Sequence, residues 1–149
     1  MSTTLEAPVT QQTALPGPDQ RPLADVVIFD GHCRFCISQV RTIERWFAAR
    51  RLAYLSLHDS RVSARYPDLS HDDLMREMYV VDRQGRRHGG AAAIRYLSRR
   101  LPRLWWVAPL LHLPGSMPLW SWLYRQVATR RYLFGRLESC DDGSCRLHV

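Results

Sequence analysis

Two cysteines, Cys33 and Cys36, have the spacing and the neighbours of a thiol–disulfide exchange site. They follow an apolar run at 26–29 that predicts a buried strand, and an Asp30-Gly31 pair that predicts a turn. Helical periodicity begins directly after them. The free N–H groups and the dipole at a helix N-terminus favour a thiolate over a thiol, so a cysteine placed there becomes a nucleophile. The pattern therefore predicts a redox-active dithiol.

The positions of the two cysteines predict different roles. Cys33 lies at the predicted start of the helix beside Arg34, so we expect it to be the more exposed sulfur and the attacking nucleophile. Cys36 lies one turn further along the same side and is the expected resolving thiol. Two other interpretations stay open: a pair of ordinary buried cysteines, and one half of a zinc site.

Three neighbours of the dithiol are candidate site residues. Asp30 could accept the proton of Cys36, or hold the loop before Cys33 through its N–H groups, or simply favour the turn. His32 and Arg34 are auxiliary candidates, because a positive charge beside Cys33 would stabilise its thiolate. An exposed loop position without a role is the alternative interpretation for His32.

Two further cysteines, Cys140 and Cys145, lie near the C-terminus. They could form an auxiliary redox pair that relays electrons with the first dithiol. All four thiols could instead bind zinc, although the spacing is poor for a zinc site. The third interpretation is that both are incidental thiols in a mobile terminus.

The rest of the chain predicts an alternating α/β domain around the dithiol. A helix from 37 to about 50 and a strand at 52–57 complete a βαβ unit, whose two strands should be parallel. Two short helices, a β-hairpin and a longer helix follow at 59–66, 70–76, 78–82 with 86–88, and 91–100. Ile94, Leu97 and Leu101 should face the core from the last of these helices.

The Asp-x-x-Cys-x-x-Cys pattern of Asp30, Cys33 and Cys36 resembles the DCC family of thiol-disulfide oxidoreductases, and so do the segments 78–93 and 131–135. The resemblance covers about residues 25–137. It implies an α/β fold of the thioredoxin-like, three-layer type and a dithiol activity. Thioredoxin-like proteins usually carry a cis-proline at the entry to the hairpin, where this chain has none, so Glu77 or Met78 would lie nearest Cys33.

A tryptophan-rich segment at 102–134 is expected to form a helical hairpin extension. Prolines interrupt it, and each arm is shorter than the roughly 20 apolar residues that a membrane span needs. We favour a hairpin that packs over the sheet or caps the dithiol, ahead of an anchor on a membrane surface. Any of its tryptophans that stay exposed would form a patch for a partner or for lipid: Trp105, Trp106, Trp120 and Trp122.

Composition and length set the remaining expectations. The 149 residues suit a thioredoxin-like domain at 25–137, flanked by a disordered N-terminal tail at 1–24 and a flexible C-terminal tail at 138–149. The net charge is +7, and all 21 of the Lys and Arg residues are arginines. No nucleic-acid-binding motif is present, so no nucleic-acid partner is expected. No signal peptide is recognised, which favours a cytoplasmic location. The oligomeric state stays open.

These observations favour a cytosolic thiol–disulfide oxidoreductase of the protein-disulfide reductase type, acting through a mixed disulfide between Cys33 and its substrate. Its partner would be a protein or small-molecule disulfide, and neither a cofactor nor a resident metal is expected. The alternative is a redox-inactive binding module that docks on a protein or membrane surface through the hairpin.

Overall fold

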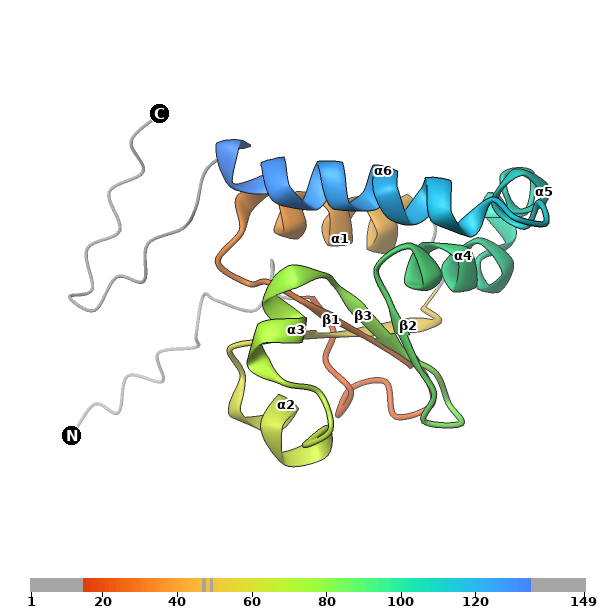
Figure 1. Ribbon diagram of the computed structural model, residues 1–149. Helices are drawn as coiled ribbons and strands as arrows, with labels where there is room; N and C mark the ends of the chain where they lie inside the picture. The colour runs from red at the N-terminus through yellow and green to blue at the C-terminus, as the bar shows by residue number, and fades with distance from the viewer. Residues whose placement is uncertain (1–14, 47, 49, 135–149) are drawn as a thin grey trace, which may run out of the picture.

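A four-stranded sheet forms the centre of the structure, a computed structural model that describes residues 15–46, 48 and 50–134 (Figure 1). The strands lie in the order β2-β1-β3-β4. Their bounds are β1 (Asp25–Phe29), β2 (Leu52–Ser56), β3 (Tyr79–Val81) and β4 (Arg87–Gly89). Because β1 is an interior strand, the chain leaves the middle of the sheet just before the candidate dithiol.

Pairing within the sheet follows the predicted connections. β1 and β2 run parallel and are joined by the helix α1 (Arg34–Trp46), so the predicted βαβ unit is confirmed. β3 runs antiparallel to both β1 and β4, as the predicted hairpin requires. This mixed α/β arrangement is consistent with the expected thioredoxin-like fold.

Alternation of side chains along β1 produces three layers. Val27 and Phe29 point to the face covered by α1 and α4 (Gly90–Arg100), where they join one apolar cluster. Val26 and Ile28 point to the opposite face and join a second cluster with Val62 and Leu74, which belong to α2 (Ser60–Arg65) and α3 (His71–Arg76). Both faces of β1 are therefore buried, which explains its unbroken apolar sequence.

The short helices α2 and α3 begin at polar caps. The side chain of Asp59 accepts the N–H of Arg61 at 2.9 Å, and Ser70 accepts the N–H of Asp73 at 3.1 Å. Such side chains satisfy N–H groups that have no partner inside the helix. The Ser70 cap confirms the start of the helix predicted at 70–76.

The expected helical hairpin is regular in its second arm only. α6 (Met117–Arg130) is continuous, whereas the first arm consists of the 3₁₀ turn η2 (Pro102–Leu104) and the single turn α5 (Ala108–Leu111). Pro109 has no N–H to donate to the carbonyl of Trp105, and the N–H of Ala108 binds that carbonyl instead, at 3.2 Å. The first arm is therefore helical, as expected, but in two short pieces rather than one continuous helix.

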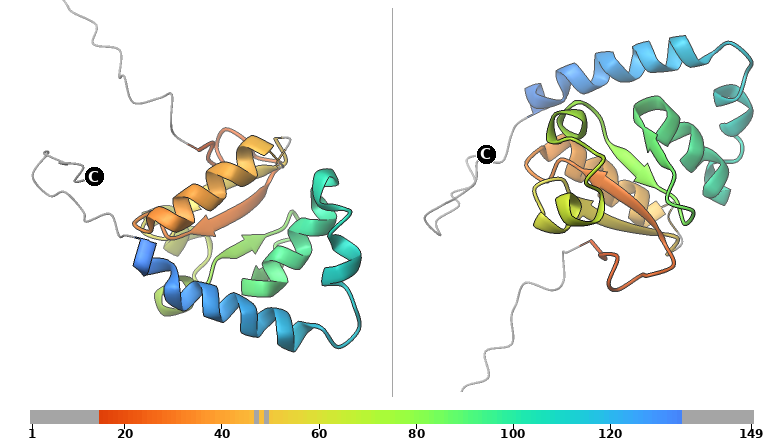
Figure 2. Two further views of the ribbon diagram at one scale, coloured as in Figure 1. Left: turned by 90° about the horizontal axis from the view of Figure 1, so that it is seen from above. Right: turned by 60° about the horizontal axis from the view of Figure 1, so that its bottom comes forward.

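The C-terminal part of the chain lies over the α1 and α4 layer. α6 packs along α4, and the following 3₁₀ turn, η3 (Arg131–Phe134), packs against α1 (Figure 2). The left view of Figure 2 shows α6 running from the α5 end towards the beginning of α1. Among the described helices, none has the length and apolar character needed to span a bilayer.

Residues 15–24 differ from the disordered tail expected at 1–24. Leu15 packs against the apolar cluster on the α1 side, and the carbonyl of Pro16 accepts the N–H of Tyr54 at 2.9 Å. Arg21 binds Glu44 on α1, with its closer N–O distance at 2.6 Å. This segment covers the outer edge of β2, where backbone groups would otherwise lack partners in the sheet. It therefore belongs to the folded domain.

Gly90 tests how tightly the start of α4 is packed. Its φ of +54° is left-handed, and an added Cβ would overlap the carboxylate of Glu77. Gly115 has a φ of +76° with open space around it, so it is a matched control for backbone strain. Gly115→Ala should lower the free energy of unfolding by about 1 kcal/mol. Gly90→Ala should lower it by at most about 1 kcal/mol more, because the Glu77 carboxylate ends a flexible side chain that can move aside. A much larger loss in urea unfolding would show that Glu77 is held in place.

Candidate functional site

The dithiol lies where the end of β1 turns into α1. The N–H of Cys33 donates to the carbonyl of Asp30 at 3.2 Å, which closes a tight turn around Gly31. The carbonyl of Cys33 accepts the N–H of Ile37 at 3.0 Å, the first hydrogen bond of the helix. Cys33 is thus the residue before α1, and Cys36 lies in the first turn, as the sequence predicts.

The two cysteines interact directly through their sulfur atoms. Both are free, and the Sγ of Cys36 donates to the Sγ of Cys33 at 2.7 Å. The backbone N–H of Cys36 also points at the sulfur of Cys33, at 3.2 Å. The sulfur of Cys33 therefore accepts two hydrogen bonds from one residue.

The exposure of the two cysteines is the reverse of the prediction. The side chain of Cys33 is 0% exposed, whereas Cys36 is half-buried. The expectation that Cys33 is the more exposed sulfur was therefore wrong. Its side chain turns back to accept the hydrogen bonds of the first helical turn, while Cys36 faces the adjoining cavity.

The environment of Cys36 keeps its proton in place. Burial, the hydrogen bond to Cys33 and the charge on Cys33 together raise the pKa of Cys36 to about 12. The negative charge of Asp30 acts in the same direction, and the positive charge of Arg131 acts against it. Cys36 is accordingly a protonated donor in the resting dithiol.

Asp30 holds the loop that leads to Cys33. Its buried carboxylate accepts the N–H of His32 at 2.9 Å and lies 3.1 Å from Nε2 of His58, while its backbone carbonyl binds the N–H of Cys33. At Gly31 a side chain would overlap that of Ser56, so the loop needs glycine there for close approach. The geometry matches the loop-holding role among those considered for Asp30.

A histidine pair covers this loop. The rings of His32 and His58 are stacked with centroids 3.8 Å apart, and His71 lies edge-on to His58 at 5.9 Å. One ligand atom each from Asp30, His32 and His58 lies within 4.8 Å of the others, so these residues could hold a metal ion. Sequence spacing did not connect His58 with the dithiol, because it reaches the site from the loop after β2.

An apolar cavity of about 340 Å³ adjoins the dithiol between α1, α4 and α6. Cys36 and Asp30 lie in its wall, and so do Phe35 and Met78. Ile94 also lines it, with 36% of its surface exposed, whereas Leu97 and Leu101 are buried in the core as predicted. The volume falls within the usual range for sites that bind small molecules.

A comparison with known families agrees with this geometry. The model of the family described as DCC1-like thiol-disulfide oxidoreductase matches residues 27–137, about three quarters of the chain. The chain belongs to the DCC1-like thiol-disulfide oxidoreductase family. No curated protein and no solved structure matches it. Family membership implies a thiol–disulfide oxidoreductase activity for this DCC1-like protein. The matched residues include the dithiol, the β3–β4 hairpin, the helical extension and η3.

Arg131 is the cation that the DCC1-like protein places beside its dithiol, in contrast to the expectation for Arg34. Arg34 is exposed and lines a separate surface hollow with Arg41. Arg131 is buried, lines the cavity with Cys36, and donates a hydrogen bond to the carbonyl of Met75. Sequence reasoning assigned Arg131 no role. The only signal was its place in the segment 131–135 that resembles the family.

Tyr124 is a second cavity residue without a predicted role. Its hydroxyl accepts the N–H of Met78 at 2.9 Å and so ties α6 to the entry of β3. Burial raises the pKa of Tyr124 to about 12. The charge of Arg131 acts to lower this pKa, and Cys36 acts to raise it. Trp120, Tyr124 and Val127 recur at helical spacing and so share one face of α6, and all three line the cavity. Cys140 and Cys145 lie outside the described residues.

Titration of Cys36 tests the electrostatics of the site. In folded Cys33→Ser protein, whose Cys140 and Cys145 are also replaced by serine, the remaining thiolate should appear well above the ordinary pKa of 9.0, because burial is the largest cause of the shift. In urea the same thiol should titrate near the ordinary value. Absorbance of the thiolate in the ultraviolet measures both, and coincident curves would contradict the shift.

The raised pKa also sets a pH dependence of stability. The reduced folded protein keeps a proton on Cys36 that the unfolded chain releases from about pH 9, so this stabilisation is complete below pH 9 and lost as the pH rises towards 12. Replacing Cys36 by alanine should make the loss of unfolding free energy between pH 8.5 and about 10 less steep.

Proposed function

We propose that this DCC1-like protein reduces disulfides by a mixed-disulfide mechanism, with Cys33 as nucleophile and Cys36 as resolving thiol. The observation that carries the proposal is the pair of hydrogen bonds from Cys36 to the sulfur of Cys33. They favour thiolate at Cys33, while the raised pKa of Cys36 keeps the second sulfur protonated until it is needed. The two thiols therefore act in a fixed order.

The reaction consists of two exchange steps. The Cys33 thiolate attacks one sulfur of the substrate disulfide, the substrate S–S bond breaks, and one substrate thiolate leaves. Cys36 then loses its proton and attacks the sulfur of Cys33, which releases the second substrate thiolate and leaves a Cys33–Cys36 disulfide. Two electrons pass from the dithiol to the substrate, and an external dithiol must restore the reduced protein.

Access to Cys33 requires a local movement, because its side chain is buried. The loop 30–33 is the segment that must shift, and it is held by Asp30 and by the stacked histidines. The apolar cavity beside Cys36 offers a surface for groups next to the substrate disulfide. We therefore expect a substrate that carries apolar side chains near its disulfide, as an unfolded protein does.

Release of the Cys36 proton is the chemical difficulty of the second step. Asp30 lines the same cavity as Cys36 and its charge acts on that thiol, so it is our candidate to receive the proton. Cytosol is the compartment that fits the proposal, because a reducing pool of dithiols would regenerate the reduced form there.

Replacement of each cysteine should separate the two steps. In a background with Cys140 and Cys145 changed to serine, Cys33→Ser should abolish the reduction of insulin by dithiothreitol above the uncatalysed rate. Cys36→Ser should still attack and should accumulate as a mixed disulfide, visible by mass spectrometry of the intact protein. Undiminished turnover in both variants would refute the assignment, and trapping on Cys36 in the Cys33→Ser variant would reverse the roles.

Asp30→Asn tests the proton transfer separately from the loop. The asparagine side chain can still accept the N–H of His32, so the loop and the melting temperature should change little. Turnover should fall by about tenfold or more near pH 7, and the deficit should shrink as the pH rises because hydroxide can then remove the Cys36 proton. Asp30→Ala is the control that also removes the loop contact. Full activity of Asp30→Asn would restrict Asp30 to holding the loop.

A further inference from the structure

The charge of the chain is divided very unevenly along its length. Residues 83–137 contain 11 arginines and neither Asp nor Glu, whereas the rest of the chain contains ten arginines and 14 acidic residues. The positive net charge of the protein therefore comes from the part that forms β4, α4 and the C-terminal helices. A segment without acidic residues presents no repulsion to an anionic surface.

The same part of the chain carries most of the exposed apolar surface. Of the twelve large apolar side chains that are exposed among the described residues, ten lie between Ile94 and Leu133. Trp106 is 81% exposed, Trp105 60% and Trp122 52%, whereas Trp120 lines the cavity. Monomeric proteins rarely leave so much apolar surface together without a partner.

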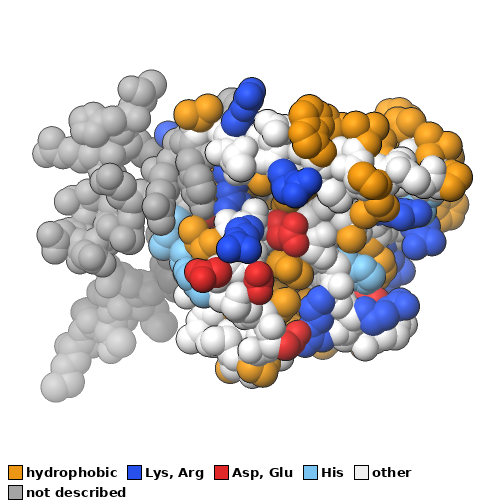
Figure 3. All heavy atoms as spheres, viewed as in Figure 1, with side chains coloured by type: hydrophobic (Ala, Val, Ile, Leu, Met, Phe, Trp, Pro, Cys, Tyr) orange, Lys and Arg blue, Asp and Glu red, His pale blue; other side chains and the backbone are white. Residues whose placement is uncertain are grey.

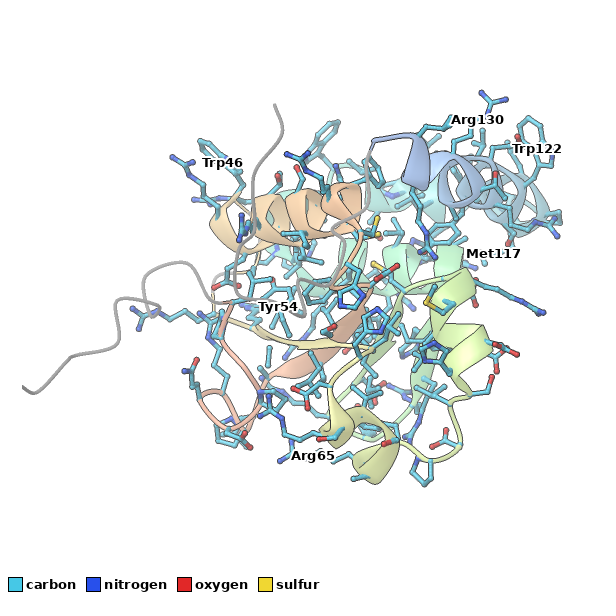
Figure 4. All side chains as sticks on the ribbon, turned by 90° about the vertical axis from the view of Figure 1, so that its left-hand side faces the viewer. Trp46, Tyr54, Arg65, Met117, Trp122 and Arg130 are labelled. Atoms are coloured by element: carbon cyan, nitrogen blue, oxygen red, sulfur yellow. The ribbon has the colours of Figure 1, made fainter. Side chains whose placement is uncertain are left out.

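These side chains gather on one side of the molecule, which we call the C-terminal helical surface: the exposed side chains of residues 102–134. Figure 3 shows hydrophobic side chains along the top and the right-hand end of the protein, over α6 and α5, with arginines beside them. α6 has no fully buried residue although most of its side chains are apolar. In Figure 4 the labelled Trp122 and Arg130 point away from the body of the protein.

Three arginines at or near this surface have no acidic partner among the described residues. Arg86, Arg87 and Arg100 pair with aspartates, at distances of 2.7–2.9 Å. By contrast, Arg99, Arg125 and Arg130 are exposed, and no ion pair with a described residue is found for them. Their charges are thus available to an external anion.

We propose that the C-terminal helical surface docks on an anionic lipid bilayer. Tryptophan and leucine side chains would enter the boundary between headgroups and acyl chains, which suits residues with an apolar body and a polar edge. The arginines would lie at the level of the lipid phosphates, where each basic residue adds binding energy. A second copy of the chain fits less well, because two like-charged surfaces would face each other.

Docking would bring the bilayer close to the redox site, because the exposed Leu123 and Val127 also line the cavity beside Cys36. α6 contributes Trp120 and Tyr124 to the cavity beside Cys36, and its exposed side chains to the C-terminal helical surface. The proposal rests on charge and exposed apolar area and does not depend on the reaction at Cys33.

Vesicle binding by the full chain tests the proposal. We expect flotation with vesicles of phosphatidylcholine containing about 30% phosphatidylserine, little binding to pure phosphatidylcholine, and a loss of binding as salt is raised. Arg99→Gln/Arg125→Gln/Arg130→Gln should weaken binding by roughly fivefold for each arginine removed. The matched control Arg41→Gln/Arg45→Gln/Arg76→Gln removes three exposed arginines of α1 and α3 and should weaken it much less.

A second measurement needs no variant. Brominated acyl chains in the anionic vesicles should quench the tryptophan fluorescence of the wild-type protein, because the exposed indoles would lie within the bilayer boundary. Absence of flotation and quenching, or equal weakening by the two triple variants, would overturn the proposal. A lipid-free dimer that Trp106→Ser/Trp122→Ser dissociates would assign the surface to self-association instead.

Discussion

The sulfur of Cys33 accepts both hydrogen bonds that Cys36 can donate, and the rest of the site depends on this contact. It exists because Cys33 is the residue before α1 and Cys36 lies in the first turn, so the backbone N–H and the thiol of Cys36 converge on one atom. The turn through Asp30 and Gly31 sets this position, since the Asp30 carbonyl binds the N–H of Cys33. One contact thus makes two chemically identical side chains unequal, because the sulfur of Cys33 is the acceptor while the raised pKa of Cys36 keeps its proton in place.

The opposite end of the described chain completes the site. Tyr124 on α6 binds the N–H of Met78, and Arg131 on η3 binds the carbonyl of Met75, so two side chains tie the C-terminal helices to the segment before β3. Both side chains line the cavity beside Cys36, and the guanidinium of Arg131 is buried in its wall. A buried positive charge lowers the pKa of Cys36 against the effect of burial, so the C-terminal segment contributes electrostatically as well as sterically.

α6 explains why the extension is both part of the site and unusually exposed. One face lines the cavity through Trp120 and Tyr124, and the opposite side carries Leu119 and Trp122 in contact with solvent. A helix that is apolar nearly all round is normally buried on all sides. Here α4 and the cavity lie beneath one face, while the outer apolar side chains are exposed to solvent among the described residues.

Local features of the fold could be predicted from the sequence because each depends on residues that are close along the chain. β1, the Asp30-Gly31 turn, the cap at Ser70 and the β3–β4 hairpin all appear where alternation, capping and turn residues predict them. Only the tertiary structure decided four other features. They are the burial of Cys33, the position of Arg131 rather than Arg34 beside the dithiol, the contact of His58 with Asp30, and the packing of residues 15–24. Each of these joins segments that are distant in sequence, and neither residue spacing nor helical periodicity carries information about which distant segments will meet.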